Sequence, residues 1–434
     1  MKLRRFTLIA LIVFTLIILS SCGDDDDDSS SDDDIANDDA NDDVGDDDAN
    51  DDADDDDAND DTDDDDDVAP EYDPALPGPY PVGNRTLIFT DEGRHDPATQ
   101  SDRMLVTEVW YPAAPEAAGM PRDVLKNFMG EWSDEVYEML SEEGAPPEEI
   151  ANFDRETGSV RDAPINNTDG PFPLIVFSHG NAGTRFQNYT QCEYLASHGF
   201  IVVAPDHTGN SLFAPLPDEL VVFDENLVFI AFWMRKWDLS FLIDEFLAMS
   251  AQEADGFFTG MIDPQKIGAM GHSFGGTAAV ETTKQDPRIR ATIVMASFMF
   301  PWYDEGFDAS LMWMIAPDDD TMGDATFLFR LDYEIAPKPK FKLEFFDGGH
   351  YTFTDSCILL PSILGDGDGC GTGERRWGDE DEFEFIEHDD AFAVINAYST
   401  AFFGFNLRGE THMRDYLTDN HFPDDMFYLQ RMGE

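Results

Sequence analysis

Short apolar runs alternate with longer segments of helical spacing through most of the chain after residue 170. A strand that is apolar at every position must be covered on both sides. Between two such runs, apolar side chains recur at the spacing of one helix face. The pattern therefore predicts an α/β fold, with a mostly parallel central sheet and helices on both faces. The apolar runs span 174–178, 200–204, 267–270, 291–296, 311–316 and 341–346, and the helical spacing is clearest at Leu239, Leu242, Ile243, Phe246 and Leu247.

The same alternation extends this domain in both directions, so that residues 71–434 are expected to form one large domain. Residues 114–165 are mostly polar, and we interpret them as an excursion between strands, with a helix over 124–140. The remaining predictions are strands at 86–90 and 104–111 and helices at 184–198, 236–250 and 391–405.

The first residues have the composition of a processing signal rather than of a folded segment. Residues 1–5 are basic, and residues 6–19 are apolar but too short to cross a membrane comfortably. The sequence Leu19-Ser-Ser-Cys22 resembles the cleavage box of bacterial lipoproteins. This resemblance implies a signal peptide over residues 1–21 and a lipid on Cys22. It also implies a place in the bacterial cell envelope, lipid-anchored and facing the periplasm or the exterior.

Residues 22–70 are dominated by aspartate, with Ala, Asn and Ser between the acidic runs. Like charges repel one another, and this stretch has little apolar surface to offset the cost of ordering it. We therefore predict a disordered tether between the lipid and the folded domain. Calcium binding is an alternative, although the runs lack the glycine turn and spaced ligands of a defined calcium loop.

The whole chain is strongly acidic, with a formal net charge of −66 from 92 acidic and 26 basic residues. Such a charge disfavours nucleic acids and anionic membrane surfaces as partners. The cysteines and histidines show no spacing typical of a metal site, so we expect no metal and no cofactor. In an oxidising compartment, Cys357 and Cys370 are the expected disulfide, and Cys192 is expected to be a buried thiol on a helix.

One stretch points directly to chemistry. Gly271-His-Ser-Phe-Gly275 fits the pattern G-x-S-x-G, with an apolar strand before it and a helix-compatible run after it. This is the context of a nucleophile elbow, where a serine lies on a strained strand-to-helix turn with its hydroxyl exposed. Ser273 is therefore the predicted nucleophile.

A serine nucleophile needs a histidine base and an acid that orients the histidine. In chain order Ser, acid, His, these residues follow the C-terminal ends of later strands. His350 follows the predicted strand 341–346 in a Gly-Gly turn, whereas the other three histidines after Ser273 lie in helical or terminal sequence. The strand before it ends in three carboxylates. Asp320 is the predicted acid, with Asp319 and then Asp318 as alternatives.

Two backbone N–H groups are needed to stabilise an oxyanion. One is expected from Phe274, directly after the nucleophile, and the other from Asn181, in the loop after strand 174–178. His179 and His272 are interpreted as structural histidines beneath the site. The aromatic stretches 205–237 and 298–313 flank the strand ends, where they form either an apolar pocket or lid, or ordinary core.

Several of these segments together resemble one family. They resemble the plasma-type platelet-activating factor acetylhydrolases and the dienelactone-hydrolase-like esterases beside them, and they are also similar to bacterial cutinases and polyester hydrolases. The resemblance covers about residues 104–405 and implies an α/β-hydrolase fold with a serine mechanism. The segments are Glu108–Ala113, Phe177–Gly180, Leu195–His207, Gly271–Gly276 and the turn at His350.

Two departures limit the resemblance. Plasma-type acetylhydrolases place their acid after the strand that follows the elbow helix, where this chain reads Met295-Ala-Ser297. The position of Asp320 is instead similar to that of cutinase-like esterases. A dienelactone hydrolase proper has a cysteine nucleophile, which Ser273 replaces here.

The predicted function is that of a lipid-anchored serine carboxylesterase that hydrolyses short- to medium-chain esters through an acyl-enzyme. One alternative is a lipase or cutinase-like polyester hydrolase, and another is a non-catalytic surface lipoprotein. The partners expected are a small-molecule or lipid ester and the membrane that holds the lipid on Cys22. The acyl length, the identity of the membrane and the oligomeric state stay open.

Overall fold

The computed structural model describes residues 72–252, 256–298, 307–376, 382–423 and 426–432. The predicted signal peptide, Cys22 and the aspartate-rich tether lie outside these residues. Within the described ranges, no helix combines the length and the apolar character needed to cross a membrane.

The described residues contain a 10-stranded sheet in the order β14-β11-β10-β9-β8-β4-β5-β2-β1-β3. The six central strands from β11 to β5 are parallel to their neighbours. Strand β2 pairs antiparallel with both β5 and β1, and β14 pairs antiparallel with β11. The strands are β1 Val82–His95, β2 Asp102–Pro112, β3 Ser159–Arg161, β4 Phe172–Ser178, β5 Ile201–Pro205, β6 Phe213–Pro215, β7 Leu220–Val222, β8 Ile262–His272, β9 Ile289–Met295, β10 Ser310–Ile315, β11 Lys340–Phe345, β12 Thr372–Glu374, β13 Glu382–Glu384 and β14 Phe427–Met432.

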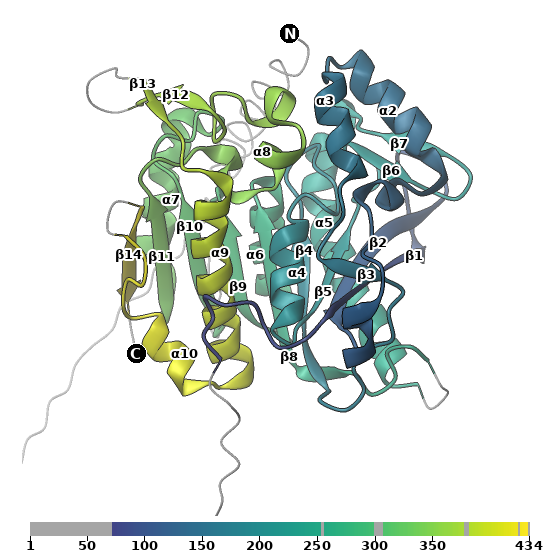
Figure 1. Ribbon diagram of the computed structural model, residues 1–434, viewed down its shortest axis with the longest axis horizontal. Helices are drawn as coiled ribbons and strands as arrows, with labels where there is room; N and C mark the ends of the chain where they lie inside the picture. The colour runs from purple at the N-terminus through teal and green to yellow at the C-terminus, as the bar shows by residue number, and fades with distance from the viewer. Residues whose placement is uncertain (1–71, 253–255, 299–306, 377–381, 424–425, 433–434) are drawn as a thin grey trace, which may run out of the picture. The chain divides into compact units, whose positions relative to one another are not determined.

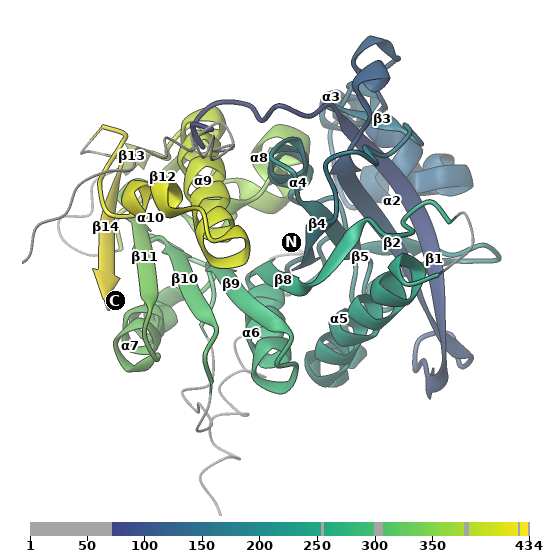
Figure 2. The ribbon, with the colours of Figure 1, turned by 90° about the horizontal axis from the view of Figure 1, so that it is seen from below.

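Helices cover both faces of this sheet, as the apolar runs predict. In Figure 2, α4 and α9 lie on one face and α5, α6 and α7 on the other. Every residue of β4 and of β10 is buried, which requires a layer on each side of the sheet. The helices are α2 Ser133–Glu142, α3 Pro147–Ile150, α4 Tyr189–Ser197, α5 Val228–Ser250, α6 Phe274–Gln285, α7 Phe327–Ile335, α8 Ser356–Leu359, α9 His388–Phe403 and α10 Thr411–Tyr416.

The bounds of the predicted helices differ from the observed ones, and α9 spans His388–Phe403 rather than 391–405. The α4 helix begins at Tyr189 rather than at residue 184, because Arg185 and Asn188 direct their polar groups to Asp206 and to the carbonyl of Phe353. The α5 helix begins at residue 228 rather than 236. The helix predicted over 124–140 is divided into a 3₁₀ segment, Leu125–Trp132, and α2, and the 3₁₀ segment is kinked at Gly130, which has φ 59°.

The excursion 114–165 lies at the end of the sheet where the loops after the parallel strands gather (Figure 1). Figure 1 shows its helices α2 and α3 at the same end of the sheet as α8. Because parallel strands point the same way, the loops after β4, β8, β10 and β11 gather at one edge of the sheet, which is where α/β folds place their ligands.

Candidate active site

Ser273 lies between the last residue of β8 and the first residue of α6. Its backbone has φ 53° and ψ −124°, a conformation that costs a non-glycine residue about 1–3 kcal/mol. Neighbouring bonds hold it there, since its N–H donates to the Met295 carbonyl at 2.8 Å and its own carbonyl accepts from Gly276 at 2.9 Å. The strain is imposed by the surrounding sheet and helix, as a nucleophile elbow requires.

The two glycines of the pentapeptide are required by close backbone contacts. A Cβ on Gly271 would lie 2.2 Å from the Gly275 carbonyl oxygen, and one on Gly275 would lie 2.0 Å from the carbonyl oxygen of Ser178. No side chain fits at either distance. The pattern G-x-S-x-G is thus the steric condition for packing the turn of Ser273 against β4 and α6.

His350 and Asp319 form a buried pair beside this turn. His350 follows β11 and Asp319 follows β10, and their Nδ1 and Oδ2 atoms lie 2.7 Å apart. The residues are 2% and 0% exposed. Burial alone would lower the pKa of His350, but the Asp319 carboxylate outweighs it and raises this pKa above the usual value.

The prediction that Asp320 orients the histidine is wrong. Asp319, the first alternative, is the residue bonded to His350. The Asp320 side chain is 72% exposed and pairs with Arg376 at 2.7 Å, while Asp318 pairs with Arg375 at 2.9 Å. The three adjacent carboxylates point in different directions because the chain turns here. Only Asp319 faces His350, and its other oxygen accepts the Met322 N–H at 2.7 Å, which fixes its orientation.

The backbone of His350 is held on two sides. Its carbonyl accepts a hydrogen bond from His272 Nε2 at 2.9 Å, and its N–H donates to the carboxylate of Asp368 at 2.8 Å. Burial, and then the nearby His350, lower the pKa of His272 well below its usual value, so this ring stays neutral. His272 supports the site from below, as predicted. Asp368 was not foreseen, because an aspartate in a Gly/Asp-rich loop has no distinctive sequence signal.

The loop after β4 is held by an arginine from α5. Arg235 is fully buried, and its Nη2 donates to the Gly180 carbonyl at 3.0 Å while its Nε donates to Asn210 at 2.8 Å. In a trans peptide the next N–H points opposite to the carbonyl. With the Gly180 carbonyl held by Arg235, the Asn181 N–H is directed away from α5, and Asn181 and Ser273 line the same pocket.

Beneath this loop lies a second Ser-His-Asp chain. The Ser178 hydroxyl lies 2.9 Å from His207 Nε2, and His207 Nδ1 lies 2.8 Å from Asp238. All three residues are fully buried, so none can reach a substrate. Burial, followed by the charge of Arg235, lowers the pKa of His207 to about 3. This chain is a satisfied polar network that supports the loop of Asn181.

The site opens into a pocket of about 310 Å³ whose walls are mainly apolar. The stretch 205–237 contributes to it only as far as Phe223. The aromatic residues of α5 do not line it, and Phe229, Trp233 and Trp237 are exposed on the surface. No described residue of 298–313 lines it. The excursion and the segment after His350 supply walls that the sequence did not reveal. The apolar lining comprises Met139, Phe153, Phe186, Leu212, Phe213, Val222, Phe223, Leu359, Leu360 and Leu364.

The remaining predicted residues are placed as follows. Phe274 is the first residue of α6, and its ring lies 5.8 Å from that of Phe232. Cys357 and Cys370 are joined in a disulfide, and Cys192 is a buried free thiol on α4. Across the part of the chain that the structure describes, no group of three His, Cys, Asp or Glu residues is arranged to hold a metal ion.

Known proteins resemble this chain in sequence and in fold. A platelet-activating factor acetylhydrolase of Bos taurus is 24% identical over 228 residues, covering 46% of this chain and 51% of that protein. Cutinase est2 of Thermobifida alba is 28% identical over 205 residues, covering 46% and 59% of the two chains. The chain thus spans about half the length of the curated relatives it matches.

A solved ferulic acid esterase from Streptomyces cinnamoneus has the same fold, with a TM-score of 0.60, 24% identity, and coverage of 77% of this chain and 93% of that one. The fold is that of the α/β-hydrolases. Residues 72–217 and 255–365 match the family described as platelet-activating factor acetylhydrolase, isoform II. Since this match extends over more than half of the sequence, the chain belongs to the platelet-activating factor acetylhydrolase, isoform II family.

Proposed function

We propose that this protein is a serine carboxylesterase that hydrolyses short- to medium-chain esters through a Ser273-His350-Asp319 triad and an acyl-enzyme. One observation carries the proposal. Ser273, on its strained turn, lines the same apolar pocket as His350, and His350 is hydrogen-bonded to the buried Asp319. The family match supports the same conclusion.

The geometry defines the role of each group. Asp319 accepts a hydrogen bond from the Nδ1–H of His350, which holds the ring in the tautomer with a lone pair on Nε2. His350 Nε2 takes the hydroxyl proton of Ser273 as the serine oxygen attacks the ester carbonyl carbon. The N–H groups of Asn181 and Phe274 stabilise the oxyanion. His350 then protonates the leaving alcohol, and a water molecule hydrolyses the acyl-enzyme by the same steps.

The pocket supports an ester whose acyl part is apolar and small. Its volume of about 310 Å³ lies at the lower end of the range for small-molecule sites. A polyester hydrolase is the second candidate, because the acid follows β10 as in cutinase-like esterases and a cutinase is among the similar proteins. Long or polymeric esters as the better substrates would favour that candidate.

The proposed location is the bacterial cell envelope, with a lipid on Cys22 and residues 22–70 as the tether. The cleavage-box sequence supports this, and so does the Cys357–Cys370 disulfide, since such bonds persist in oxidising compartments. Labelling of the wild type by a fatty-acid probe in a bacterial host, with no labelling of Cys22→Ser, is the expected result. Equal labelling of both would refute it.

The activity is tested with p-nitrophenyl acetate, butyrate and decanoate, using the full chain and Ser273→Ala. Hydrolysis by the wild type, abolished in the variant, is expected, with acetate or butyrate preferred over decanoate. A folded wild type without activity on any of the three esters would refute the proposal. It would favour the alternative of a non-catalytic surface lipoprotein.

A further inference from the structure

We propose that Asp368 is a positioning residue that holds Asp319 and His350 in register, and that the Cys357–Cys370 disulfide holds Asp368 in place. This inference rests on the proposed triad. Asp368 is 9% exposed and lies two residues before Cys370. It neither lines the pocket nor contacts Ser273, so its part is to fix the groups that do.

A single carboxylate connects the two loops that carry the pair. One oxygen of Asp368 accepts the N–H groups of His350 at 2.8 Å and Asp320 at 2.9 Å. The other accepts the N–H of Thr321 at 2.8 Å and its hydroxyl at 2.7 Å. These four bonds join the loop after β10 to the turn after β11. Asp319 and His350 add one direct side-chain bond between the same two loops.

The negative charge of the Asp368 carboxylate strengthens the four hydrogen bonds that it accepts. A buried carboxylate that accepts several backbone N–H groups is a strong acceptor, and such charge-assisted bonds are about twice as strong as neutral ones. Burial and then the nearby Asp319 raise the pKa of Asp368 to about 6, while His350 and the hydrogen-bond donors act in the opposite direction. Above that pH the ionised carboxylate has every lone-pair direction needed for the four donors.

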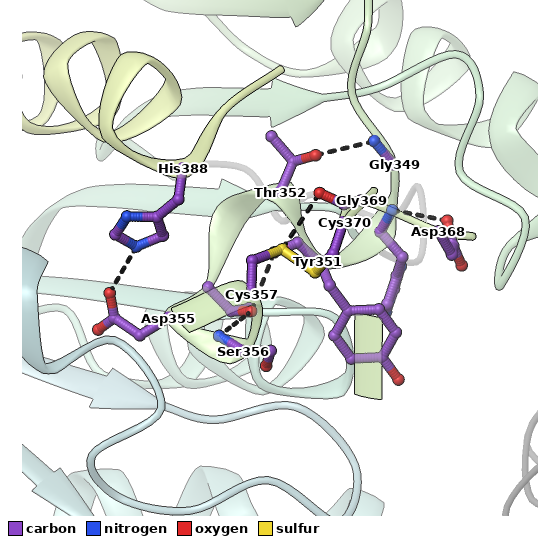
Figure 3. The surroundings of a disulfide bond; sticks show 12 residues. Gly349, Tyr351, Thr352, Asp355, Ser356, Cys357, Asp368, Gly369, Cys370 and His388 are labelled. Atoms are coloured by element: carbon purple, nitrogen blue, oxygen red, sulfur yellow. Dashed lines mark hydrogen bonds and ion pairs between the residues drawn. A yellow bond between two sulfur atoms is a disulfide. The ribbon is translucent and has the colours of Figure 1, made fainter. Parts of the chain in front are cut away.

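The loop of Asp368 is pressed against the histidine turn by backbone contact. The Tyr351 N–H donates to the Asp368 carbonyl at 2.9 Å. A Cβ on Gly349 would lie 2.4 Å from the carbonyl carbon of Asp368, and one on Gly369 would lie 2.6 Å from the nitrogen of Thr352. Glycines on both sides of the contact thus allow the two segments to touch, as Figure 3 shows for these labelled residues.

The other end of the loop is anchored independently of the site. Asp355, fully buried and two residues before Cys357, accepts the Thr190 N–H of α4 at 3.0 Å and pairs with His388 of α9 at 2.9 Å. Figure 3 shows this ion pair on the far side of the disulfide from Asp368. Cys357 is therefore tied to two helices, and the disulfide transmits that fixed position to Cys370 and Asp368.

The segment that follows Cys370 extends the same attachment. Arg375 pairs with Asp318 at 2.9 Å and also with Asp347, which joins the two loops a second time. Arg376 pairs with the exposed Asp320. Ion pairs of partly exposed side chains are weak. The buried bonds of Asp368 therefore carry most of the constraint.

The first test compares Asp368→Asn with Asp366→Asn in the full chain, using p-nitrophenyl butyrate. Both changes replace the same group in the same loop, but Asp366 is exposed and serves as the control. In Asp368→Asn an NH₂ group replaces one of the two accepting oxygens and faces groups that are themselves hydrogen-bond donors. The variant should therefore lower kcat about 10- to 100-fold, as small misplacements of catalytic groups do, with KM nearly unchanged. Asp366→Asn should match the wild type. A folded Asp368→Asn with wild-type kcat would refute the inference.

A double-mutant cycle separates positioning from a general structural effect. If Asp368 acts through Asp319, Asp368→Asn should cost little further activity in an Asp319→Asn background. Independent, additive losses would refute the proposed role. Circular dichroism confirms that each variant is folded at the assay temperature. Should Asp368→Asn not fold, Thr321→Val removes the hydroxyl donor of the same cluster and is expected to cause a smaller, again non-additive, loss of kcat. Because Thr321 also lines the pocket, an additive loss would refute the inference.

The role of the disulfide is tested by reduction and by substitution. Tris(2-carboxyethyl)phosphine and one water molecule convert the disulfide to two thiols, and the phosphine is oxidised to the phosphine oxide with the oxygen of that water. The reduced wild type and Cys357→Ser/Cys370→Ser should both lose kcat, while Asp368→Asn should respond less to the reductant. Unchanged kcat after complete reduction would refute the role of the disulfide. An inactive wild type would instead contradict the proposed function, which keeps the two failures distinct.

Discussion

The choice among Asp318, Asp319 and Asp320 leads to the sharpest prediction. Asp319→Asn replaces the carboxylate 2.7 Å from His350 Nδ1 with an amide of the same size. If the amide NH₂ faces Nδ1, the ring proton moves to Nε2, and His350 can no longer accept the proton of Ser273. The variant should fold and bind substrate, but with the histidine in the wrong tautomer.

The magnitude follows from the loss of the correct tautomer. The same substitution in the serine protease triad lowers kcat about 10⁴-fold, which corresponds to roughly 5.4 kcal/mol at 1.36 kcal/mol per decade. Asp320→Asn is the matched control. Its carboxylate is 72% exposed and pairs only with arginine at the surface, an interaction worth about 0–1 kcal/mol. It should keep kcat within about twofold of the wild type.

The assay is initial-rate hydrolysis of p-nitrophenyl butyrate at pH 8, with Ser273→Ala defining the background. KM should change little in both variants, because neither side chain lines the pocket. Equal losses in the two variants would show that the loop as a whole, and not the Asp319–His350 bond, matters. A large loss in Asp320→Asn alone would overturn the assignment of Asp319.

Three further predictions concern the base, the oxyanion loop and the pocket. Because Asp319 raises the pKa of His350 and only the neutral ring acts as base, kcat/KM should rise with pH through a midpoint above about 6.5; a midpoint below 6 in a profile over pH 5–9 would contradict this. Arg235→Met, which frees the Gly180 carbonyl, should lower kcat about 10²- to 10³-fold with KM retained. Arg330→Met, at an exposed arginine, is its control, and equal kcat in the two variants would refute the role of Arg235 in holding the loop. Leu364→Ala should reduce kcat/KM for decanoate by roughly 10-fold while sparing acetate, because the acyl group of acetate has only one methyl to place in the pocket that Leu364 lines. Equal losses for both esters would contradict the pocket assignment.

Local patterns were sufficient for much of the fold and for the strained strand-to-helix turn at Ser273. Continuous apolar strands such as 174–178 and 267–270 have only one environment that buries both faces, so a parallel sheet follows. Ser273 and the loop of Asn181 are recognised for a similar reason. In both segments the positions of the glycines, and the order of strand, turn and helix, are required by contacts within the segment or with the neighbouring strand.

The pairing of His350 was beyond such patterns. Three carboxylates in a row are equivalent in sequence, and the direction of each depends on how the turn after β10 meets Arg375, Arg376 and His350. Asp319 faces the histidine, while the buried Asp318 pairs with Arg375 and the exposed Asp320 pairs with Arg376. That arrangement involves residues more than 25 positions away, so propensity and spacing along the chain carry no information about it.

The sequence by itself determined the α/β class, the elbow of Ser273, and a histidine turn after a late strand, because these are local geometries that few residue types satisfy. Only the tertiary structure decided which aspartate serves His350, which helices line the pocket, and how Arg235 and Asp368 hold the reacting groups. Those choices depend on side chains from separate strands and helices meeting at one edge of the sheet. Burial makes each such meeting selective, because a polar group without its partner is too costly to keep there.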